Sequence, residues 1–127
     1  MVLVVDDDPA TRSLLRLLLE IEGHAVVEAA HGEEALNMIG RETLPDLVVT
    51  DLMMPVLGGL ELIKRLHAEP LTAAIPIVVV SANSEAALDL QISGAVTAVV
   101  GKPFIASAFA ESIRAIARGP VKTAPAA

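Results

Sequence analysis

Four short apolar runs in this chain each end at a polar or charged side chain. Residues 2–5 are followed by Asp6, Asp7 and Asp8, residues 48–50 by Asp51, residues 77–80 by Ser81, and residues 96–100 by Lys102 after one glycine. A continuous run of β-branched residues is typical of a strand buried on both faces, as in a parallel sheet. In an open parallel α/β sheet, the carboxyl ends of the strands gather at one edge, where ligands bind. The sequence therefore predicts a polar site built from strand ends.

Patterns typical of helices separate these runs, and one weaker strand is added. Asp8 suits a helix N-cap and Pro9 the first helical position, and leucines then recur at helical spacing up to Gly23. The expected helices cover about residues 9–22, 32–39, 60–67, 84–92 and 105–117, and the expected strands cover residues 2–5, 25–28, 46–50, 77–80 and 96–100. Strands that alternate with helices require parallel crossovers. The predicted fold class is therefore α/β, with a doubly wound five-stranded parallel sheet.

Composition limits both the core and the partners. At 127 residues the chain can form one domain, and 54% of its residues are apolar although only Phe104 and Phe109 are aromatic. The net charge of -7 argues against a direct nucleic-acid surface, which needs a clustered basic face, and against an anionic membrane. The absence of cysteine excludes disulfides, thiolate catalysis and Cys-ligated zinc.

The domain limits and location follow from the same reading. No apolar run reaches the ~18 residues of a membrane span, and no charged leader precedes the first apolar run. We expect a soluble cytoplasmic protein with one domain over residues 1–117. Residues 118–127 are rich in Pro and Ala and are expected to form a flexible tail or the start of a linker.

The strand ends supply groups that suit phosphoryl transfer. If the first, third and fourth strands are neighbours, Asp6, Asp7, Asp51, Ser81 and Lys102 lie near one point. Crowded carboxylates repel one another, and oxygen ligands without His or Cys favour Mg²⁺, with Mn²⁺ as the alternative ion, over zinc. A cation, a lysine and a hydroxyl around a carboxylate would cradle a phosphoryl group. We therefore expect Asp51 to be a nucleophile that forms an acyl phosphate.

Each of these residues also has a purely structural interpretation when it is taken alone. Asp8 can cap a helix within a solvated turn, Asp51 can be a turn residue, Ser81 a helix cap and Lys102 a surface lysine. Four separate strand ends that supply complementary groups are hard to explain by chance. The three histidines lie far apart and away from the strand ends, so we interpret them as solvent-exposed or packing residues: His24, His31 and His67.

Four segments together resemble the receiver domains of bacterial two-component response regulators. They are Val4-Val5-Asp6-Asp7-Asp8-Pro9, Asp51-Leu52-Met53-Met54-Pro55 with Gly59-Leu60-Glu61-Leu62 after it, Ser81-Ala82, and Lys102-Pro103-Phe104. The resemblance covers nearly the whole chain, from Val2 to about Ala117. It implies a flavodoxin-like (βα)5 fold with strand order 2-1-3-4-5.

The resemblance also implies a metal site and a phosphoacceptor. Asp51 is similar to the phosphoacceptor of these domains, which also contacts the metal. Asp7 is similar to a direct Mg²⁺ ligand and Asp6 to a ligand that acts through water. The remaining protein ligand in the family is the backbone carbonyl two residues after the phosphoacceptor, which is Met53 here.

Three further positions are compared with the family in the same way. Ser81 resembles the hydroxyl that turns toward the phosphoryl group, and Lys102 resembles the lysine that pairs with it. The family has a cis peptide after this lysine, so Lys102–Pro103 is expected to be cis. Receivers commonly carry Tyr or Phe where this chain has Val99. A valine has no ring to rotate, so the usual aromatic switch is absent or altered.

The resemblance implies a domain that takes a phosphoryl group from a histidine kinase or histidine phosphotransfer protein and signals to an output protein or domain. Such a domain catalyses only its own phosphorylation and dephosphorylation. Two alternatives differ in class. Val99 is compatible with a receiver-like interaction module that works without phosphorylation. A haloacid-dehalogenase-like phosphatase would use Asp6 as nucleophile and Asp8 as general acid, but it needs a late acidic pair, and after Lys102 only Glu111 is acidic.

Overall fold

Strands and helices alternate along the whole described part of the chain, which is residues 1–40 and 43–118 of a computed structural model. The strands are β1 (Val2–Val5), β2 (Val26–Ala29), β3 (Leu47–Thr50), β4 (Ile77–Ser81) and β5 (Ala98–Gly101). The helices are α1 (Pro9–Ile21), α2 (Gly32–Met38), α3 (Gly59–Ala68), α4 (Ser84–Ile92) and α5 (Ala106–Arg118). The expected tail lies almost entirely outside the described residues, and its first residue, at 118, ends α5.

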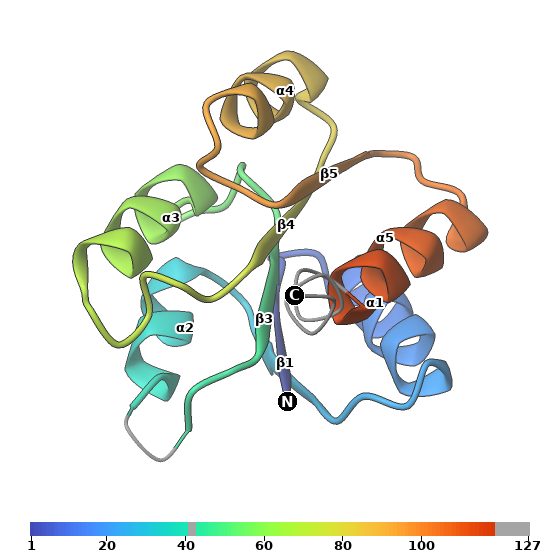
Figure 1. Ribbon diagram of the computed structural model, residues 1–127, viewed down its shortest axis with the longest axis horizontal. Coiled ribbons are helices and arrows are strands. Elements are labelled where there is room, and N and C mark those ends of the chain that lie inside the picture. The colour runs from blue at the N-terminus through green and yellow to red at the C-terminus, as the bar shows by residue number, and fades with distance from the viewer. Residues whose placement is uncertain (41–42, 119–127) are drawn as a thin grey trace, which may run out of the picture.

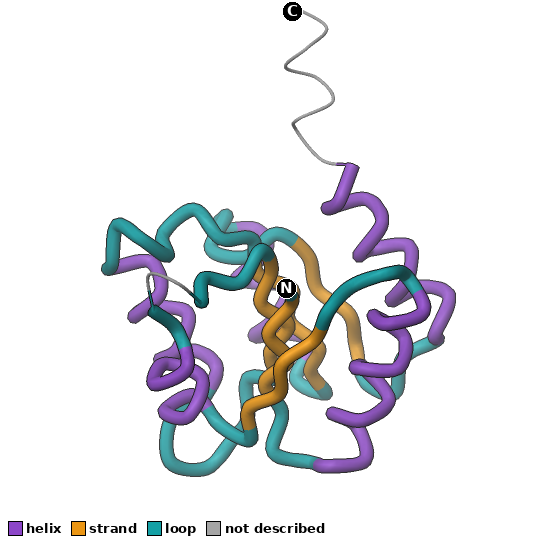
Figure 2. The backbone as a smooth tube through the Cα atoms, turned by 90° about the horizontal axis from the view of Figure 1, so that it is seen from below, coloured by secondary structure: helices purple, strands orange, loops and turns teal. Residues whose placement is uncertain are grey.

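The five strands form one parallel sheet in the order β2-β1-β3-β4-β5. Helices α1 and α5 cover one face, and α2, α3 and α4 cover the other (Figure 1). The view in Figure 2 shows the strands between two groups of helices. The predicted fold class and strand order are confirmed.

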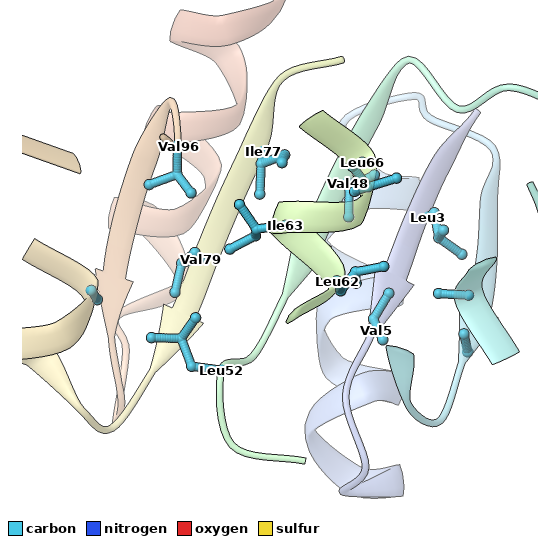
Figure 3. Packing of buried hydrophobic residues seen from close by; sticks show 13 residues of the cluster. Leu3, Val5, Val48, Leu52, Leu62, Ile63, Leu66, Ile77, Val79 and Val96 are labelled. Carbon is cyan, nitrogen blue, oxygen red and sulfur yellow. The ribbon is translucent and has the colours of Figure 1, made fainter. Parts of the chain in front are cut away.

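The core consists of two apolar layers, one on each face of the sheet. Leu3 and Val5 point toward α2 and α3, whereas Val2 and Val4 point toward α1 and α5. The first layer, drawn in Figure 3, joins Leu3, Val5, Val48, Ile77 and Val79 of the sheet to Leu62, Ile63 and Leu66 of α3. The continuous apolar runs of β1, β3 and β4 are thus explained, because strands covered on both faces need apolar residues at every position.

Edge strands are less regular, and their bounds differ from the sequence prediction. β2 begins and ends one residue later than expected, and β5 begins at Ala98 although the expected run began two residues earlier. Val96 is buried in the first layer, but it lies in the turn after α4, where Ala95 N–H donates to the Leu90 carbonyl. Its apolar character therefore reflects core packing and not strand pairing.

Strand register brings distant residues to the same edge of the sheet. Val5 of β1 is the partner of Thr50 of β3, so the next residues of the two strands, Asp6 and Asp51, emerge side by side. On the other side, Ser81 of β4 is the partner of Gly101 of β5. Parallel pairing of β1, β3, β4 and β5 is thus what assembles the polar edge.

Helix α2 begins at a histidine that caps it. The His31 Nδ1 accepts a hydrogen bond from the Glu34 N–H at 3.2 Å, and the Glu34 carboxylate accepts one from the Ala30 N–H at 2.7 Å. This arrangement resembles a capping box in which an imidazole replaces the usual hydroxyl, but the Glu34 carboxylate reaches the N–H of Ala30, one residue before the cap. The interpretation of His31 as a solvent-exposed or packing residue did not include this capping role.

The loop from Asp51 to Gly59 is closed tightly against the end of β3. The Gly59 N–H donates to the Leu52 carbonyl, and a Cβ atom on Gly59 would lie 1.9 Å from the Asp51 carbonyl oxygen. Within the loop, Val56 has a φ of 66°, a region that β-branched residues rarely adopt. The start of α3 therefore depends on a residue without a side chain at position 59.

Replacing Gly59 with alanine tests this close approach. The Cβ atom meets rigid backbone, so we expect Gly59→Ala to lower the free energy of unfolding by about 2 kcal/mol or more. Gly101→Ala is the matched control, because a Cβ at Gly101 has no neighbour within 4 Å. Urea unfolding followed by far-UV circular dichroism measures both, since the chain has no Trp or Tyr. Equal stability of the two variants would contradict the expectation.

Candidate functional site

A lysine joins two buried carboxylates at the carboxyl edge of the sheet. The Lys102 ammonium lies 2.9 Å from Asp6 Oδ2 and 2.7 Å from Asp51 Oδ2. Asp6 is 1% exposed and Asp51 is 7% exposed, so both charges are largely removed from water. Buried carboxylates need a counter-charge and hydrogen bonds. Lys102 supplies the counter-charge to both from the segment that follows β5.

The pKa of Lys102 reflects this position. Burial of the ammonium lowers the pKa, but hydrogen bonds to Asp51 and Asp6 and the charges of both carboxylates raise it, and the net direction is upward. Because the pKa is raised, the ammonium is present at neutral pH, and its stabilising contribution is lost only when pH rises through the folded-state value above 10.5. The lysine is thus a fixed positive charge under ordinary conditions.

The remaining carboxylate oxygens are held by backbone N–H groups. Asp6 Oδ1 accepts from the Asp8 N–H at 2.9 Å, and Asp51 Oδ1 accepts from the N–H groups of Leu52 at 2.6 Å and Met53 at 3.3 Å. In residues 1–40 and 43–118, no buried side-chain oxygen or nitrogen lacks a hydrogen-bond partner. The two carboxylates are therefore fixed in orientation by the loops that follow β1 and β3.

A third carboxylate completes an acidic group that could hold a metal ion. Asp6, Asp7 and Asp51 each offer an oxygen, and these atoms lie within 4.8 Å of one another. Asp7 is exposed, so a bound ion would keep access to water. All three donors are hard oxygen ligands, a set that suits a hard divalent cation. The donor set therefore fits the ion that the sequence predicted.

Comparison with known proteins identifies the family. The response regulator receiver domain family matches residues 2–114. This chain belongs to that family. Its receiver domain is 41% identical to protein-glutamate methylesterase/protein-glutamine glutaminase 3 of Paramagnetospirillum magneticum, over 98% of this chain and 36% of the relative. It is 42% identical to the phosphate regulon transcriptional regulatory protein PhoB of Rhizobium meliloti, over 65% of this chain and 36% of the relative.

A solved structure extends this comparison to the fold. The response regulator TrrA of Thermotoga maritima, in complex with Mg²⁺-BeF, is 34% identical with a TM-score of 0.77, and the match covers 89% of this chain and 95% of that one. The chain spans 36% of the length of each of the two curated relatives. The shared unit is thus the receiver domain, and the two relatives contain further sequence.

Two other predicted residues of the receiver domain, Ser81 and Met53, lie at the same edge of the sheet, and only the backbone N–H of Met53 is hydrogen-bonded to Asp51. Ser81 is fully buried at the end of β4, and its hydroxyl oxygen accepts from the Asn83 N–H at 3.1 Å. The Ser81 carbonyl accepts from the Lys102 N–H, which ties the ends of β4 and β5 together. Met53 directs its side chain outward, at 68% exposure, so only its backbone is suited to the site.

Two further expectations concern β5 and the segment after it. The Lys102–Pro103 peptide bond is cis, as the resemblance implied. Val99 is half-buried on β5, where it is paired with Val79 and contacts the first apolar layer. At this position the receiver domain has an aliphatic packing residue.

Sequence reasoning missed one basic residue near the site. Arg12 of α1 donates to the backbone carbonyl of Asp6 at 2.7 Å. The available signal was the position of Arg12, a basic residue in the first turns of a helix that starts beside the acidic group. Its partner is a backbone carbonyl, and such a contact cannot be predicted from residue types. The other arginine pairs of α3 and α5, Arg65 with Glu61 and Arg114 with Glu22, lie away from the acidic group.

The described residues also bear on membrane association. In residues 1–40 and 43–118, every helix is too short or too polar to cross a bilayer.

Removing the Lys102 charge tests its role as counter-ion. Lys102→Met would leave two buried carboxylates facing each other, so we expect the free energy of unfolding to fall by about 3 kcal/mol without added cation. A millimolar divalent cation should restore more stability in this variant than in the wild type, because it binds the folded acidic group. Urea unfolding with and without MgCl₂ measures both effects. The exposed Lys64 of α3 gives the control, Lys64→Met, and equal losses in the two variants would contradict the expectation.

Proposed function

We propose that this receiver domain accepts a phosphoryl group on Asp51. The observation that carries the proposal is the buried Asp51 carboxylate, which is hydrogen-bonded to Lys102 and lies within the acidic group of Asp6 and Asp7. Membership of the receiver family supports the same conclusion. The domain then acts on itself, through phosphorylation and later hydrolysis, and not as a turnover enzyme.

The chemical step is an in-line displacement at phosphorus. A carboxylate oxygen of Asp51 forms a bond to phosphorus while the bond from phosphorus to the donor breaks. The electron pair of that broken bond stays on the donor atom, which is a histidine nitrogen when the donor is a histidine kinase or phosphotransfer protein. The product is an acyl phosphate on Asp51. The step needs no proton from Asp51, because a carboxylate is already the nucleophilic form.

We propose Mg²⁺ as the cation, with Mn²⁺ as the alternative. Asp6, Asp7, Asp51 and the Met53 carbonyl would hold it, and the oxygen-only donor set of the three carboxylates supports this choice. The Mg²⁺-BeF complex of the TrrA relative supports it as well. When bound, the cation supplies positive charge to the phosphoryl oxygens.

Lys102 and Ser81 would act on the transferred group. The Lys102 ammonium already contacts Asp51 Oδ2, so it lies close enough to contact the oxygens of a phosphoryl group that is transferred to that carboxylate. Ser81 is buried at the neighbouring strand end, and rotation of its hydroxyl away from Asn83 would bring a donor toward the same group. Both residues are thus proposed to stabilise the phosphoryl group and not to form bonds with it.

The wider setting is also part of the proposal. Residues 1–117 would form the receiver domain, and residues 118–127 a tail or the start of a linker. The phosphodonor would be a histidine kinase or phosphotransfer protein in the cytoplasm, and the phosphorylated domain would signal to an output protein or domain. We propose no contact with nucleic acid or membrane, because the net charge is -7.

Helix α1 offers a surface for the phosphodonor. Leu14, Leu17 and Ile21 are spaced at helical intervals and are 44%, 54% and 69% exposed, while Leu15 and Leu19 of the same helix are buried. The helix is capped by Asp8, which follows Asp7 of the acidic group, so a protein that covers this apolar stripe would lie next to Asp51. Exposed apolar stripes of this kind mark protein contacts.

Phosphorylation of Asp51 is tested by intact mass. After incubation with Mg²⁺ and a small acyl phosphate such as acetyl phosphate, we expect the wild type to gain one phosphoryl group and Asp51→Asn to gain none. Asp8→Asn is the matched control, because asparagine also caps helices and Asp8 is exposed with its carboxylate on Thr11. It should be phosphorylated like the wild type. A phosphoryl group that persists in Asp51→Asn would overturn the proposal.

The same variants, assayed also with a phosphomonoester and with beryllofluoride, separate the two alternative functions. A haloacid-dehalogenase-like phosphatase would lose activity in Asp8→Asn and keep it in Asp51→Asn, with turnover of a phosphomonoester. An interaction module that works without phosphorylation would gain no mass, and it would not respond to beryllofluoride with Mg²⁺.

The α1 stripe is tested by a single charged substitution. We expect Leu17→Glu to slow phosphotransfer from a histidine kinase, chosen because it phosphorylates the wild type, by about tenfold, since a buried charge weakens the complex. Phosphorylation by acetyl phosphate should not change. The control is Leu88→Glu on α4, where Leu88 is 52% exposed. If both variants accept the phosphoryl group from the kinase at the wild-type rate, the donor does not dock on this stripe.

A further inference from the structure

Arg12 links the acidic group to the strand at the sheet edge. Its Nη1 donates to the backbone carbonyl of Asp6 at 2.7 Å, and its Nε donates to Glu28 Oε1 of β2 at 2.9 Å. The side chain is 19% exposed, so the guanidinium is largely covered. One planar group thus joins three elements: the end of β1, the first turns of α1, and β2.

The Asp6 carbonyl lies where the sheet stops holding the chain. Asp6 still donates its N–H to the Ala29 carbonyl of β2, but β1 itself ends at Val5. The chain then turns, and the Asp8 N–H donates to Asp6 Oδ1. The bond from Arg12 holds the peptide between Asp6 and Asp7, and that peptide determines where both carboxylates are presented.

We propose that Arg12 is a positioning residue for the cation site: it fixes the Asp6–Asp7 peptide against β2, so that both carboxylates face Asp51. This inference rests on the proposed function for the identity of the cation. Arg12 itself has no oxygen to offer and contacts no carboxylate of the acidic group. Its effect on the cation therefore passes through the backbone of Asp6.

Glu28 keeps the guanidinium in place. Its second oxygen accepts from Arg16 Nη1 at 2.8 Å, so the carboxylate is held from two sides, and Arg16 also contacts Glu20. The hydrogen bond from Arg16 is the largest cause of the lowered pKa of Glu28, with a further contribution from Arg12, so this carboxylate stays ionised at neutral pH. A lysine at position 12 could not reach the Asp6 carbonyl and Glu28 with the same planar fork.

Charge and position predict opposite effects on cation affinity. The positive charge of Arg12 repels a nearby cation, so its removal by charge alone would tighten cation binding. Loss of the bond to the Asp6 carbonyl would weaken cation binding, because the two carboxylates lose their fixed orientation. A weaker affinity for the cation in an Arg12 variant would therefore indicate a positioning role, and a tighter affinity would indicate a charge effect alone. A change in the free energy of unfolding could not separate these two roles.

Arg16 provides a matched control. It contacts the same Glu28 carboxylate from the same helix, but it does not contact the Asp6 carbonyl. Isothermal titration with MgCl₂ alone gives the dissociation constant without any phosphodonor. We expect Arg12→Met to bind Mg²⁺ about tenfold more weakly than the wild type, and Arg12→Lys to be weakened in the same direction. Arg16→Met should remain within about twofold of the wild type.

The outcomes separate this proposal from the proposed function. If the wild type binds Mg²⁺ and Arg12→Met binds it equally or more tightly, Arg12 does not position the site, while phosphorylation of Asp51 still stands. Equal weakening in Arg16→Met would also overturn the proposal, because loss of the Glu28 pair would then explain the effect. If Arg12→Met does not fold in urea titrations, Arg12→Lys decides in its place. A wild type that binds neither Mg²⁺ nor Mn²⁺ overturns this proposal and the proposed cation, while phosphorylation of Asp51 is judged by the intact mass.

Discussion

The ion pairs of Lys102 with Asp6 and Asp51 are the interaction on which the rest of this structure depends. Two carboxylates that are almost fully buried and adjacent would be costly without a counter-charge. The lysine that supplies it comes from a segment 51 residues after Asp51 and 96 residues after Asp6. Only the pairing of β1, β3, β4 and β5 in one sheet brings these groups together. The pairing of the buried carboxylates with Lys102 therefore depends on the order of the strands in the sheet.

That constraint explains why the central strands are so uniform. β1, β3 and β4 are buried on both faces and carry the register that aligns Asp6, Asp51 and Ser81. A slip of one residue in a parallel pair would turn each carboxylate from the edge into an apolar layer. The apolar residues on both faces prevent such a slip, because every side chain already fills a defined place in one of the two layers. Packing thus serves the site by fixing register.

Much of this could be predicted from the sequence, for physical reasons that also mark the limits. Continuous apolar runs ending in polar groups predicted the central strands and the residues at their ends. Edge strands were predicted less well, since Val96 is buried by the turn after α4 and not by pairing. The capping role of His31 is a local contact, and it was not predicted because histidine is not among the usual cap residues. The role of Arg12 was not predicted because its side chain binds a backbone atom whose position is set by tertiary structure. The close approach of Gly59 to Asp51 is of the same kind.

The formal charges of the site explain why a cation and a lysine belong together here. Three carboxylates and one ammonium leave a charge of about −2, which a divalent cation would balance. A phosphoryl group carries about −1.5 to −2, so its addition to Asp51 without a cation would concentrate still more negative charge at a buried edge. Lys102 alone stabilises the unphosphorylated pair but cannot offset that addition. On the proposal that Asp51 is phosphorylated, Lys102 would balance part of the charge of the acidic group, and a divalent cation would offset the charge that the phosphoryl group adds.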